Sequence, residues 1–331
     1  MTDSIIHVEN LCKKYADKTV VDHVSFNVAE GELFGFLGPN GAGKTTTIRM
    51  LTTITSVTEG SARVAGHDVV TDPGAVRASI GVVPQQLIAD DELTGIENVL
   101  LFARLHHVPK EKAVKRTSEL LQLVDLESSA EKKAKTYSGG MKRRLQLAMG
   151  LVHDPRLLFL DEPSLGLDIQ TRSKMWDYVR KLNNEKGITV FMTTHYLEEA
   201  DALCDRVAIV DGGVIKVSGS PAELKMRLGG DLLSIQVTDG PDLTQFFEGI
   251  QDVRDVKKLD YSSYEIRVPR VEKVLPEIVD GVVQRGLKIS DISFTRPTLD
   301  QVFLQVTGRQ IRDGEGESTR TPVAPVLMEE V

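Results

Sequence analysis

Residues 31–52 read Gly-Glu-Leu-Phe-Gly-Phe-Leu-Gly-Pro-Asn-Gly-Ala-Gly-Lys-Thr-Thr-Thr-Ile-Arg-Met-Leu-Thr, and this stretch decides the fold. The short apolar run at 31–37 predicts a buried strand, and the run that begins at Thr46 predicts the start of a helix. Between them lies the pattern of a phosphate-binding loop: Gly38, Pro39, Asn40, Gly41, Ala42, Gly43, Lys44 and Thr45. A strand, this loop and a helix in that order predict an α/β nucleotide-binding fold.

Each residue type in the loop suits contact with phosphate. The glycines allow backbone N–H groups to approach phosphate closely, and the N-terminus of the following helix adds positive potential. We expect Lys44 to reach the β- and γ-phosphates, Thr45 to place its hydroxyl on Mg²⁺, and Thr46 to complete the nucleotide contact. A glycine-rich turn before an ordinary helix would explain the glycines but not the Lys-Thr pair.

A second strand is predicted to end in two acidic residues. The run at 157–160 is Leu-Leu-Phe-Leu, which is typical of a fully buried strand in a parallel sheet, and Asp161 and Glu162 follow it. Asp161 suits Mg²⁺, directly or through water, and Glu162 is placed to polarise the attacking water. A strand that ends in solvated acids is the alternative, but the phosphate loop upstream favours catalysis.

Three further residues are weaker candidates. His195 follows an apolar run at 190–194, where the next strand of the sheet would end. Ligands gather at the carboxyl ends of such strands, so we interpret His195 as a γ-phosphate sensor, although a lone histidine is more often structural. Gln85 ends a strand at 81–85 and offers a neutral oxygen to Mg²⁺. Tyr15 is a candidate for stacking on adenine, and packing on a β-sheet is equally compatible with its sequence.

Taken in order, these motifs resemble those of the ATP-binding subunits of ABC transporters, over roughly the first two thirds of the chain. Tyr15 falls where the family carries its adenine-stacking aromatic, and Gln85 and His195 match the glutamine loop and the switch histidine. The remaining matches are the phosphate loop, the signature Ser138-Gly139-Gly140, the second nucleotide motif at 157–162 and the dimer loop that ends at Asp168. The resemblance implies a P-loop NTPase core of the ABC ATPase type.

The signature departs from the common Leu-Ser-Gly-Gly-Gln of the family. It reads Tyr-Ser-Gly-Gly-Met at 137–141, with an intact Ser-Gly-Gly core, and Lys142-Arg143-Arg144 follows it. We interpret those three basic residues as a solvated helix face or as a packing site for the phosphate-proximal loops. This form of the signature, and the sequence at 296–308, resemble the branch typified by daunorubicin-resistance ATPases. That branch exports drugs or lipids through a separate ABC-2-type membrane subunit.

The resemblance also implies how the chain works. In the family, the phosphate loop of one copy faces the signature of a second copy. We therefore expect Ser138, Gly139, Gly140 and Asp168 to contact the nucleotide bound by the partner, so that two chains enclose two ATP molecules. ATP would close this dimer and hydrolysis would open it, which would drive a separate multi-span permease. The chain would lie at the cytoplasmic face of the membrane and export a drug, antibiotic or lipid-like cargo.

The chain divides into three parts along its length. The predicted nucleotide-binding domain spans 4–229, with an antiparallel β layer near 4–28 and a helical subdomain at about 87–140 that presents a groove to the membrane partner. The Gly-Gly pair at 229–230 predicts a boundary. A small α+β domain of ferredoxin-like type follows at 230–308, with expected strands at 232–237, 253–259, 264–268 and 287–294 and helices at 271–284 and 299–306. Residues 309–331 are predicted to be a disordered tail.

Composition excludes several classes of protein. The chain has 331 residues, of which 41% are hydrophobic and 27% charged, as is typical of a globular protein with room for two domains. It has neither an apolar run long enough to span a membrane nor a signal peptide pattern. The two cysteines, Cys12 and Cys204, indicate packing in a reducing compartment. The net charge of −8 argues against nucleic-acid binding.

Other functions remain compatible with the motifs. A soluble ABC-type ATPase that acts in an assembly process without a membrane partner is the main alternative. A switch that binds ATP but barely hydrolyses it is less compatible, because Glu162 and His195 are both present. DNA-repair members need a long coiled-coil insertion, and translation members carry two nucleotide domains, neither of which this sequence contains. Within the transporter family an importer is the alternative, because export is inferred by analogy.

Overall fold

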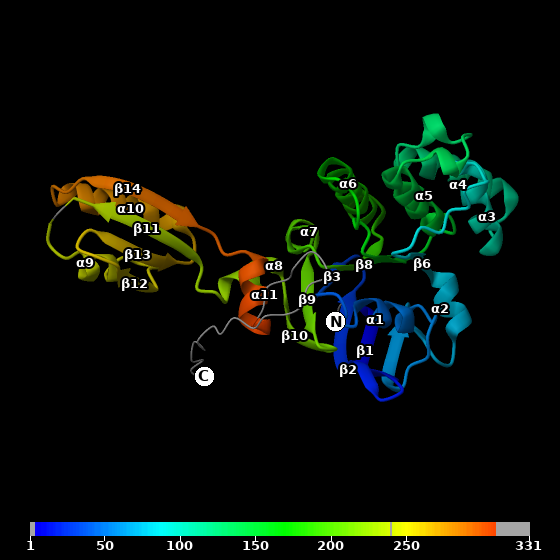
Figure 1. Cartoon of the computed structure of the whole chain (residues 1–331), viewed down its shortest axis with the longest axis horizontal. Helices are drawn as coiled ribbons and strands as arrows, with labels where there is room; N and C mark the ends of the chain where they lie inside the picture. Colours follow the sequence, from blue (N-terminus) through cyan, green and yellow to red (C-terminus); the bar gives the residue numbers. More distant parts are fainter. Residues whose placement is uncertain (1–3, 239, 309–331) are drawn as a thin grey trace. The chain divides into compact units, whose positions relative to one another are not determined.

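The computed structural model describes residues 4–238 and 240–308, which form two compact units that divide between Ser218 and Gly219 (Figure 1). The predicted α/β core is confirmed in the first unit by a six-stranded sheet with the order β10-β9-β3-β8-β7-β6. Adjacent strands from β9 to β6 run parallel. The strands are β3 (Leu33–Leu37), β6 (Ile80–Val83), β7 (Leu157–Asp161), β8 (Thr189–Thr194), β9 (Arg206–Asp211) and β10 (Val214–Gly219).

An antiparallel sheet forms the predicted β layer beside this core. Its order is β2-β1-β4-β5, and every neighbouring pair is antiparallel. The strands are β1 (Ser4–Tyr15), β2 (Lys18–Ala29), β4 (Glu59–Val64) and β5 (His67–Asp68), so the layer extends beyond the two strands expected from the sequence. Phe26 of β2 stacks on Phe34 of β3 at a centroid distance of 5.7 Å, and Phe191 of β8 packs on both. These aromatic contacts join the two sheets through one apolar core.

Helices flank the sheets, and a group of three of them lies where the helical subdomain was expected but extends beyond the expected end near residue 140. The helices of the α/β part are α1 (Lys44–Leu51), α2 (Pro73–Ser79), α6 (Ile169–Lys186) and α7 (Leu197–Leu203). The subdomain contains α3 (Gly95–Leu105), α4 (Lys110–Leu123) and α5 (Gly139–Leu151), with short 3₁₀ turns at Glu127–Ser129 and Ala134–Thr136. Helix α3 starts at a capping box, in which Thr94 and Glu97 each bond the backbone of the other.

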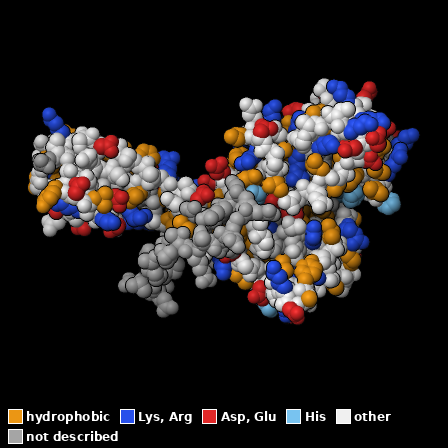
Figure 2. Space-filling view, viewed as in Figure 1, with side chains coloured by type: hydrophobic (Ala, Val, Ile, Leu, Met, Phe, Trp, Pro, Cys, Tyr) orange, Lys and Arg blue, Asp and Glu red, His pale blue; other side chains and the backbone are white. Residues whose placement is uncertain are grey.

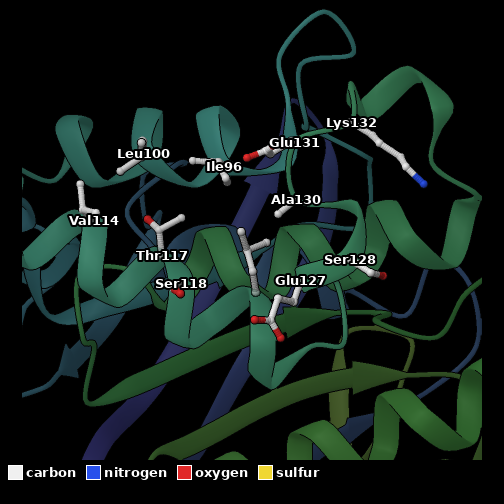
Figure 3. Close-up of a pocket in the computed structure, with 11 residues that line it drawn as sticks. Ile96, Leu100, Val114, Thr117, Ser118, Glu127, Ser128, Ala130, Glu131 and Lys132 are labelled. Carbon is white, nitrogen blue, oxygen red and sulfur yellow. The ribbon is translucent and has the colours of Figure 1, made fainter.

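A cavity of about 550 Å³ lies within the helical subdomain (Figure 3). Its walls are Ile96 and Leu100 from α3, Val114 and Thr117 from α4, and the segment at 127–132. No residue of the predicted nucleotide site lines it.

The second unit contains the predicted ferredoxin-like domain. Its sheet has the order β12-β13-β11-β14 with antiparallel pairs throughout, and its β-α-β-β-α-β succession is that of the ferredoxin-like fold. The elements are α8 (Pro221–Met226), β11 (Asp231–Val237), α9 (Thr244–Glu248), β12 (Asp255–Lys258), β13 (Ser263–Val268), α10 (Val271–Gln284), β14 (Ile289–Thr295) and α11 (Leu299–Thr307). Helix α10 has the predicted bounds, whereas α8 and α9 were not predicted.

The boundary between the units lies earlier than the Gly229-Gly230 pair. Helix α8 packs against α11, so it belongs to the second unit although it precedes the glycines. Both glycines have positive φ, and a Cβ on Gly230 would lie 2.2 Å from the carbonyl oxygen of Val268. The pair therefore forms a tight turn into β11 inside the second unit. The tail predicted at 309–331 lies outside the described residues.

Within residues 4–238 and 240–308, no helix is both long enough and apolar enough to cross a bilayer.

Candidate active site

The phosphate-loop sequence lies between β3 and α1, where two glycines are required by their surroundings. Gly43 has a φ of 101°, and a Cβ there would lie 2.7 Å from the carbonyl oxygen of Val20. A Cβ on Gly38 would lie 2.2 Å from the carbonyl oxygen of Val210. The loop is therefore held against the backbones of β2 and β9, and it leads into the N-terminus of α1.

Lys44 occupies the inside of this loop and is 5% exposed. Its ammonium group donates to the carbonyl oxygens of Gly38 at 2.8 Å and Pro39 at 3.2 Å. It also lies 3.2 Å from Oε1 of Glu162. Burial lowers the pKa of Lys44 from its usual value, and the negative charges of Glu162 and Asp161 oppose that change. The cation thus lies between the loop carbonyls and the acidic end of β7.

Thr45 and Asp161 meet at the end of the sheet. The hydroxyl of Thr45 donates to Oδ1 of Asp161 at 3.1 Å, and the hydroxyl of Thr193 donates to the same oxygen at 2.6 Å. The sequence analysis assigned no role to Thr193. The signal was present, because Thr193-Thr194 places two hydroxyl residues directly after the apolar run Val190-Phe191-Met192. Hydroxyl and carboxylate oxygens are the hard ligands that Mg²⁺ takes, so the group of atoms fits this ion.

Glu162 follows β7 and has an unusual backbone conformation. Its φ is 49°, which is uncommon for a residue other than glycine. Its N–H lies 3.1 Å from both the backbone oxygen and the hydroxyl of Thr193, which holds the turn in place. This conformation directs the side chain toward the phosphate loop, where the carboxylate contacts Lys44.

Two predicted residues converge on the other oxygen of this carboxylate. The side-chain amide of Gln85 donates to Oε2 of Glu162 at 3.2 Å, and Nδ1 of His195 lies 3.3 Å from the same oxygen. Burial raises the pKa of Glu162, but the hydrogen bond from His195 and the charge of Lys44 outweigh it, so the pKa lies below its usual value. The structure places Gln85 beside the catalytic candidate, and its contact with a metal stays a prediction.

Arg143 belongs to the basic run that the sequence predicts to be either a solvated helix face or a packing site for the phosphate-proximal loops. Its side chain is 3% exposed, so Arg143 does not lie on a solvated helix face. The packing interpretation therefore applies to this residue. Its guanidinium donates to the carbonyl oxygens of Pro84 at 2.7 Å, Glu162 at 2.8 Å and Pro163 at 2.9 Å. Helical periodicity in the sequence could have indicated the burial of Arg143. Gln146 and Leu147 follow it by three and four residues on α5 and are also buried.

The two neighbours of Arg143 have different surroundings. Lys142 is partly exposed and pairs with Asp91. Arg144 donates to the carbonyl oxygens of Val124 at 2.9 Å and Asp125 at 3.0 Å, within the helical subdomain. Neither contact involves the end of the sheet.

The signature and the dimer loop lie side by side at the surface. Ser138 caps α5 by accepting a hydrogen bond from the backbone N–H of Met141, and Asp168 caps α6 through Thr171. A Cβ on Gly140 would lie 2.5 Å from Cγ2 of Thr171, so the two caps are adjacent. Both cap residues are exposed, and no hydrogen bond or ion pair joins them to the phosphate loop among the described residues.

Tyr15 lies apart from these contacts. Its side chain is 46% exposed, and the ammonium of Lys13 lies 4.9 Å from the centre of its ring. An exposed ring is compatible with the predicted stacking on adenine, which stays a prediction.

Comparison with known proteins assigns the family. The ABC transporter profile matches residues 21–165, and the profile of the C-terminal domain of DrrA1-3-like ATP-binding proteins matches residues 219–307. The chain is 41% identical to the daunorubicin resistance ATP-binding protein DrrA3 of Streptomyces coeruleorubidus, over 93% of this chain and 97% of the relative. It is 40% identical to the doxorubicin resistance ATP-binding protein DrrA of Mycobacterium tuberculosis, over 92% of this chain and 94% of the relative.

A solved structure agrees with this assignment. A dimeric ATP-binding cassette in a post-hydrolysis state, bound to ADP and Pi, is 28% identical and has a TM-score of 0.59. It covers 65% of this chain, and 98% of that chain is matched. The chain is similar to the resistance proteins over more than nine tenths of its length. Lys44, Asp161 and Glu162 also meet at the end of its sheet. The chain belongs to the ABC transporter ATP-binding proteins of the daunorubicin- and doxorubicin-resistance type, and it binds and hydrolyses ATP.

Proposed function

We propose that this chain is the ATP-hydrolysing subunit of an exporter, in which it dimerises on ATP and powers a separate multi-span permease of the ABC-2 type. The observation that carries the proposal is the environment of Glu162, whose two carboxylate oxygens lie against Lys44, Gln85 and His195. The relatives are named for resistance to daunorubicin and doxorubicin, so a drug, antibiotic or lipid-like cargo is the proposed class. The chain would act at the cytoplasmic face of the membrane.

The proposed chemistry is in-line attack of water on the γ-phosphate. The loop N–H groups and Lys44 would bind and orient the phosphates, and His195 would help to hold the water. Glu162 is kept ionised by its neighbours, so its carboxylate can accept a hydrogen bond and then a proton from that water. Thr45, Asp161 and Gln85 would hold Mg²⁺, which would neutralise charge on the phosphate oxygens.

A second copy completes the proposed site. Ser138 and Asp168 are exposed on one surface and bond only within their own helix starts among the described hydrogen bonds, so their predicted nucleotide would be bound by a partner. The signature would add hydrogen-bond donors to the γ-phosphate, which ADP lacks. ATP would therefore favour the closed dimer and hydrolysis would release it, because a ligand shifts an equilibrium by its differential affinity for the two states.

Replacing Thr45 with valine tests the proposed Mg²⁺ ligand. The variant keeps the shape of the side chain and removes one oxygen, a loss worth about 1.4 kcal/mol, or roughly tenfold in affinity. We expect the Mg²⁺ concentration for half-maximal phosphate release to rise about tenfold. ATP binding measured in EDTA should change little. Thr55→Val, outside the loop, is the control. An unchanged Mg²⁺ requirement of the Thr45→Val protein would remove Thr45 from the proposed Mg²⁺ ligands.

An exposed apolar pair on α3 is the proposed contact with the permease. Leu101 and Leu105 are 38% and 64% exposed and lie one helical turn apart. Leu87 and Ile88, in the segment between β6 and α3, are also exposed. Figure 2 shows hydrophobic side chains among Lys and Arg side chains on this part of the molecule. Such a mixture suits an amphipathic segment of a membrane protein that reaches out of the bilayer.

Charged substitutions on α3 test this contact. The double variant Leu101→Glu, Leu105→Glu is expected to lose the permease in a pull-down from detergent-solubilised native membranes, because two carboxylates would be desolvated in the interface. Phosphate release by the isolated subunit should stay within about twofold, since neither residue touches the site. Val70→Glu, at another exposed apolar residue, is the control. Equal recovery of the permease with all three proteins would reject this surface.

The same pull-down with the unmodified chain tests the proposed function itself. Recovery of one multi-span protein would support the transporter, and its identity would indicate the cargo. Recovery of soluble proteins alone would favour the ATPase that acts in assembly without a membrane partner.

A further inference from the structure

Arg143 joins the signature helix to the end of the β-sheet. It lies on α5, whose first turn carries the signature, and its side chain leaves the helix toward the end of the β-sheet. Its guanidinium donates three hydrogen bonds to backbone carbonyl groups and one, at 3.2 Å, to the side chain of Gln146. A guanidinium has five donors in a rigid fork, so this one is almost fully used by groups inside the protein.

The three carbonyl groups belong to the two segments that meet at the catalytic carboxylate. Glu162 and Pro163 form the turn after β7, and Pro84 directly precedes Gln85 in the chain. The amide of Gln85 in turn donates to Oε2 of Glu162. Arg143 therefore binds the backbone at both ends of that side-chain contact. Glu162 needs such support, because its φ of 49° is costly for a residue with a Cβ.

Gln146 strengthens the same connection from one turn further along α5. Its side chain is 1% exposed, accepts from Arg143 and donates to the carbonyl oxygen of Gln86 at 2.7 Å. The carbonyl groups on both sides of Gln85 are thus bound by one face of one helix. Burial lowers the pKa of Arg143, and the charges of Asp161, Glu162 and Glu199 oppose the change, so the cation is balanced by the acids of the site.

Helix α5 makes this arrangement relevant to the dimer. Ser138 caps the helix and Arg143 lies five residues later, about one and a half turns away, on the same hydrogen-bonded element. A displacement of the signature must therefore move the guanidinium, and with it the turn that carries Glu162. Interiors are close-packed, so such displacements are transmitted rather than absorbed.

We propose that Arg143 is a positioning residue that couples the two ATP sites of the dimer. When Ser138 contacts the nucleotide bound by the partner, α5 and Arg143 set the turn that holds this chain's own Glu162. Hydrolysis at one site then depends on engagement at the other. The inference rests on the proposed dimer, in which each signature serves the nucleotide of the other copy.

The adjacent arginine provides a matched experiment. We compare Arg143→Lys with Arg144→Lys, because Arg144 donates to carbonyl groups at 124 and 125 and interacts with Tyr178 of α6, and none of these groups is bound by Arg143. A lysine keeps the charge but cannot bridge three separate carbonyl groups. For Arg143→Lys we expect kcat to fall by about 10- to 100-fold, as for a displaced catalytic group, and ATP affinity to change by less than about threefold. The Hill coefficient for ATP should fall toward one, and Arg144→Lys should retain the wild-type values.

A second background separates positioning from damage to the fold. In Glu162→Gln protein, ATP-dependent dimers are followed by size-exclusion chromatography with and without Arg143→Lys. Dimer formation in both supports the inference, because nucleotide and signature contacts then survive without the guanidinium. If Arg143→Lys does not fold, Gln146→Met, which removes the acceptor and the bond to Gln86 at similar volume, replaces it, with an expected fall of severalfold in kcat.

Three outcomes would overturn the inference. The first is an unchanged kcat for Arg143→Lys, or for Gln146→Met where that variant replaces it. The second is a Hill coefficient of the variant equal to that of the wild type. The third is loss of the ATP-dependent dimer only when Arg143 is replaced. Absence of a dimer in Glu162→Gln protein that retains Arg143 is a different result. It would reject the proposed ATP-enclosing dimer itself.

Discussion

Replacement of Glu162 by glutamine is expected to lower kcat for ATP hydrolysis by about 10²- to 10⁴-fold while ATP still binds. Glutamine has the same shape and keeps an oxygen for the hydrogen bond from Gln85 and the contact with His195. It cannot accept the proton of the attacking water, so the reaction stops after binding. Because ATP is then not consumed, we expect the protein to accumulate as a dimer, measured by light scattering after addition of ATP and Mg²⁺.

The control for this variant is Glu198→Gln, an exposed acid at the start of α7 that has no contact with the site. It should hydrolyse ATP at the wild-type rate and return to the monomer as ATP is used. Normal turnover of Glu162→Gln would remove Glu162 from its catalytic role. Slow turnover without dimer accumulation would instead count against the closure of two copies around ATP.

Replacement of Lys44 by alanine is expected to weaken ATP binding by roughly 10- to 100-fold, since a hydrogen bond from a charged donor contributes about 1.5–3 kcal/mol. The ammonium lies inside the phosphate loop, donates to the carbonyl oxygen of Gly38 and is almost fully buried, so its removal takes a positive charge out of the loop. Its removal also leaves Glu162 without its cation. Affinity for a fluorescent ATP analogue measures the effect, and phosphate release should fall in parallel.

Lys174→Ala removes an exposed lysine from α6 and serves as the comparison. It should bind the analogue as tightly as the wild type. Lys44→Ala with undiminished affinity would contradict the phosphate-loop assignment, whereas weaker binding with a normal thermal unfolding temperature would place the loss at the site and not in the fold.

The sequence predicted those parts of the fold that depend on local pattern. Strands β3, β7 and β8 are short, contain an apolar run and are buried along their whole length, which is typical of a parallel sheet covered on both faces. Helix α10 follows a clear helical period. In contrast, β4 contains Glu-Gly-Ser-Ala-Arg-Val and becomes a strand because β1 supplies its partner, which no local pattern reveals.

The site shows the same division between local and distant information. Lys44, Thr45, Asp161 and Glu162 belong to contiguous motifs, and the structure brings all four together. The buried position of Arg143 depends on carbonyl groups at 84, 162 and 163, far from it in the chain. A charged residue is normally exposed, so the sequence left both a solvated face and a packing site open for this residue, and the folded structure selects packing. The contact of Gln85 with Glu162 likewise required the folded sheet.

The positive φ of Glu162 has a consequence for the evolution of this protein. Glycine or asparagine would adopt that backbone conformation at lower cost, so either substitution would relieve strain at this turn. Neither residue can act as the base, so the variant protein would be more stable but would no longer hydrolyse ATP. Selection for stability and selection for activity therefore oppose each other at position 162. A gain in thermal stability that keeps the activity must come from substitutions at other positions.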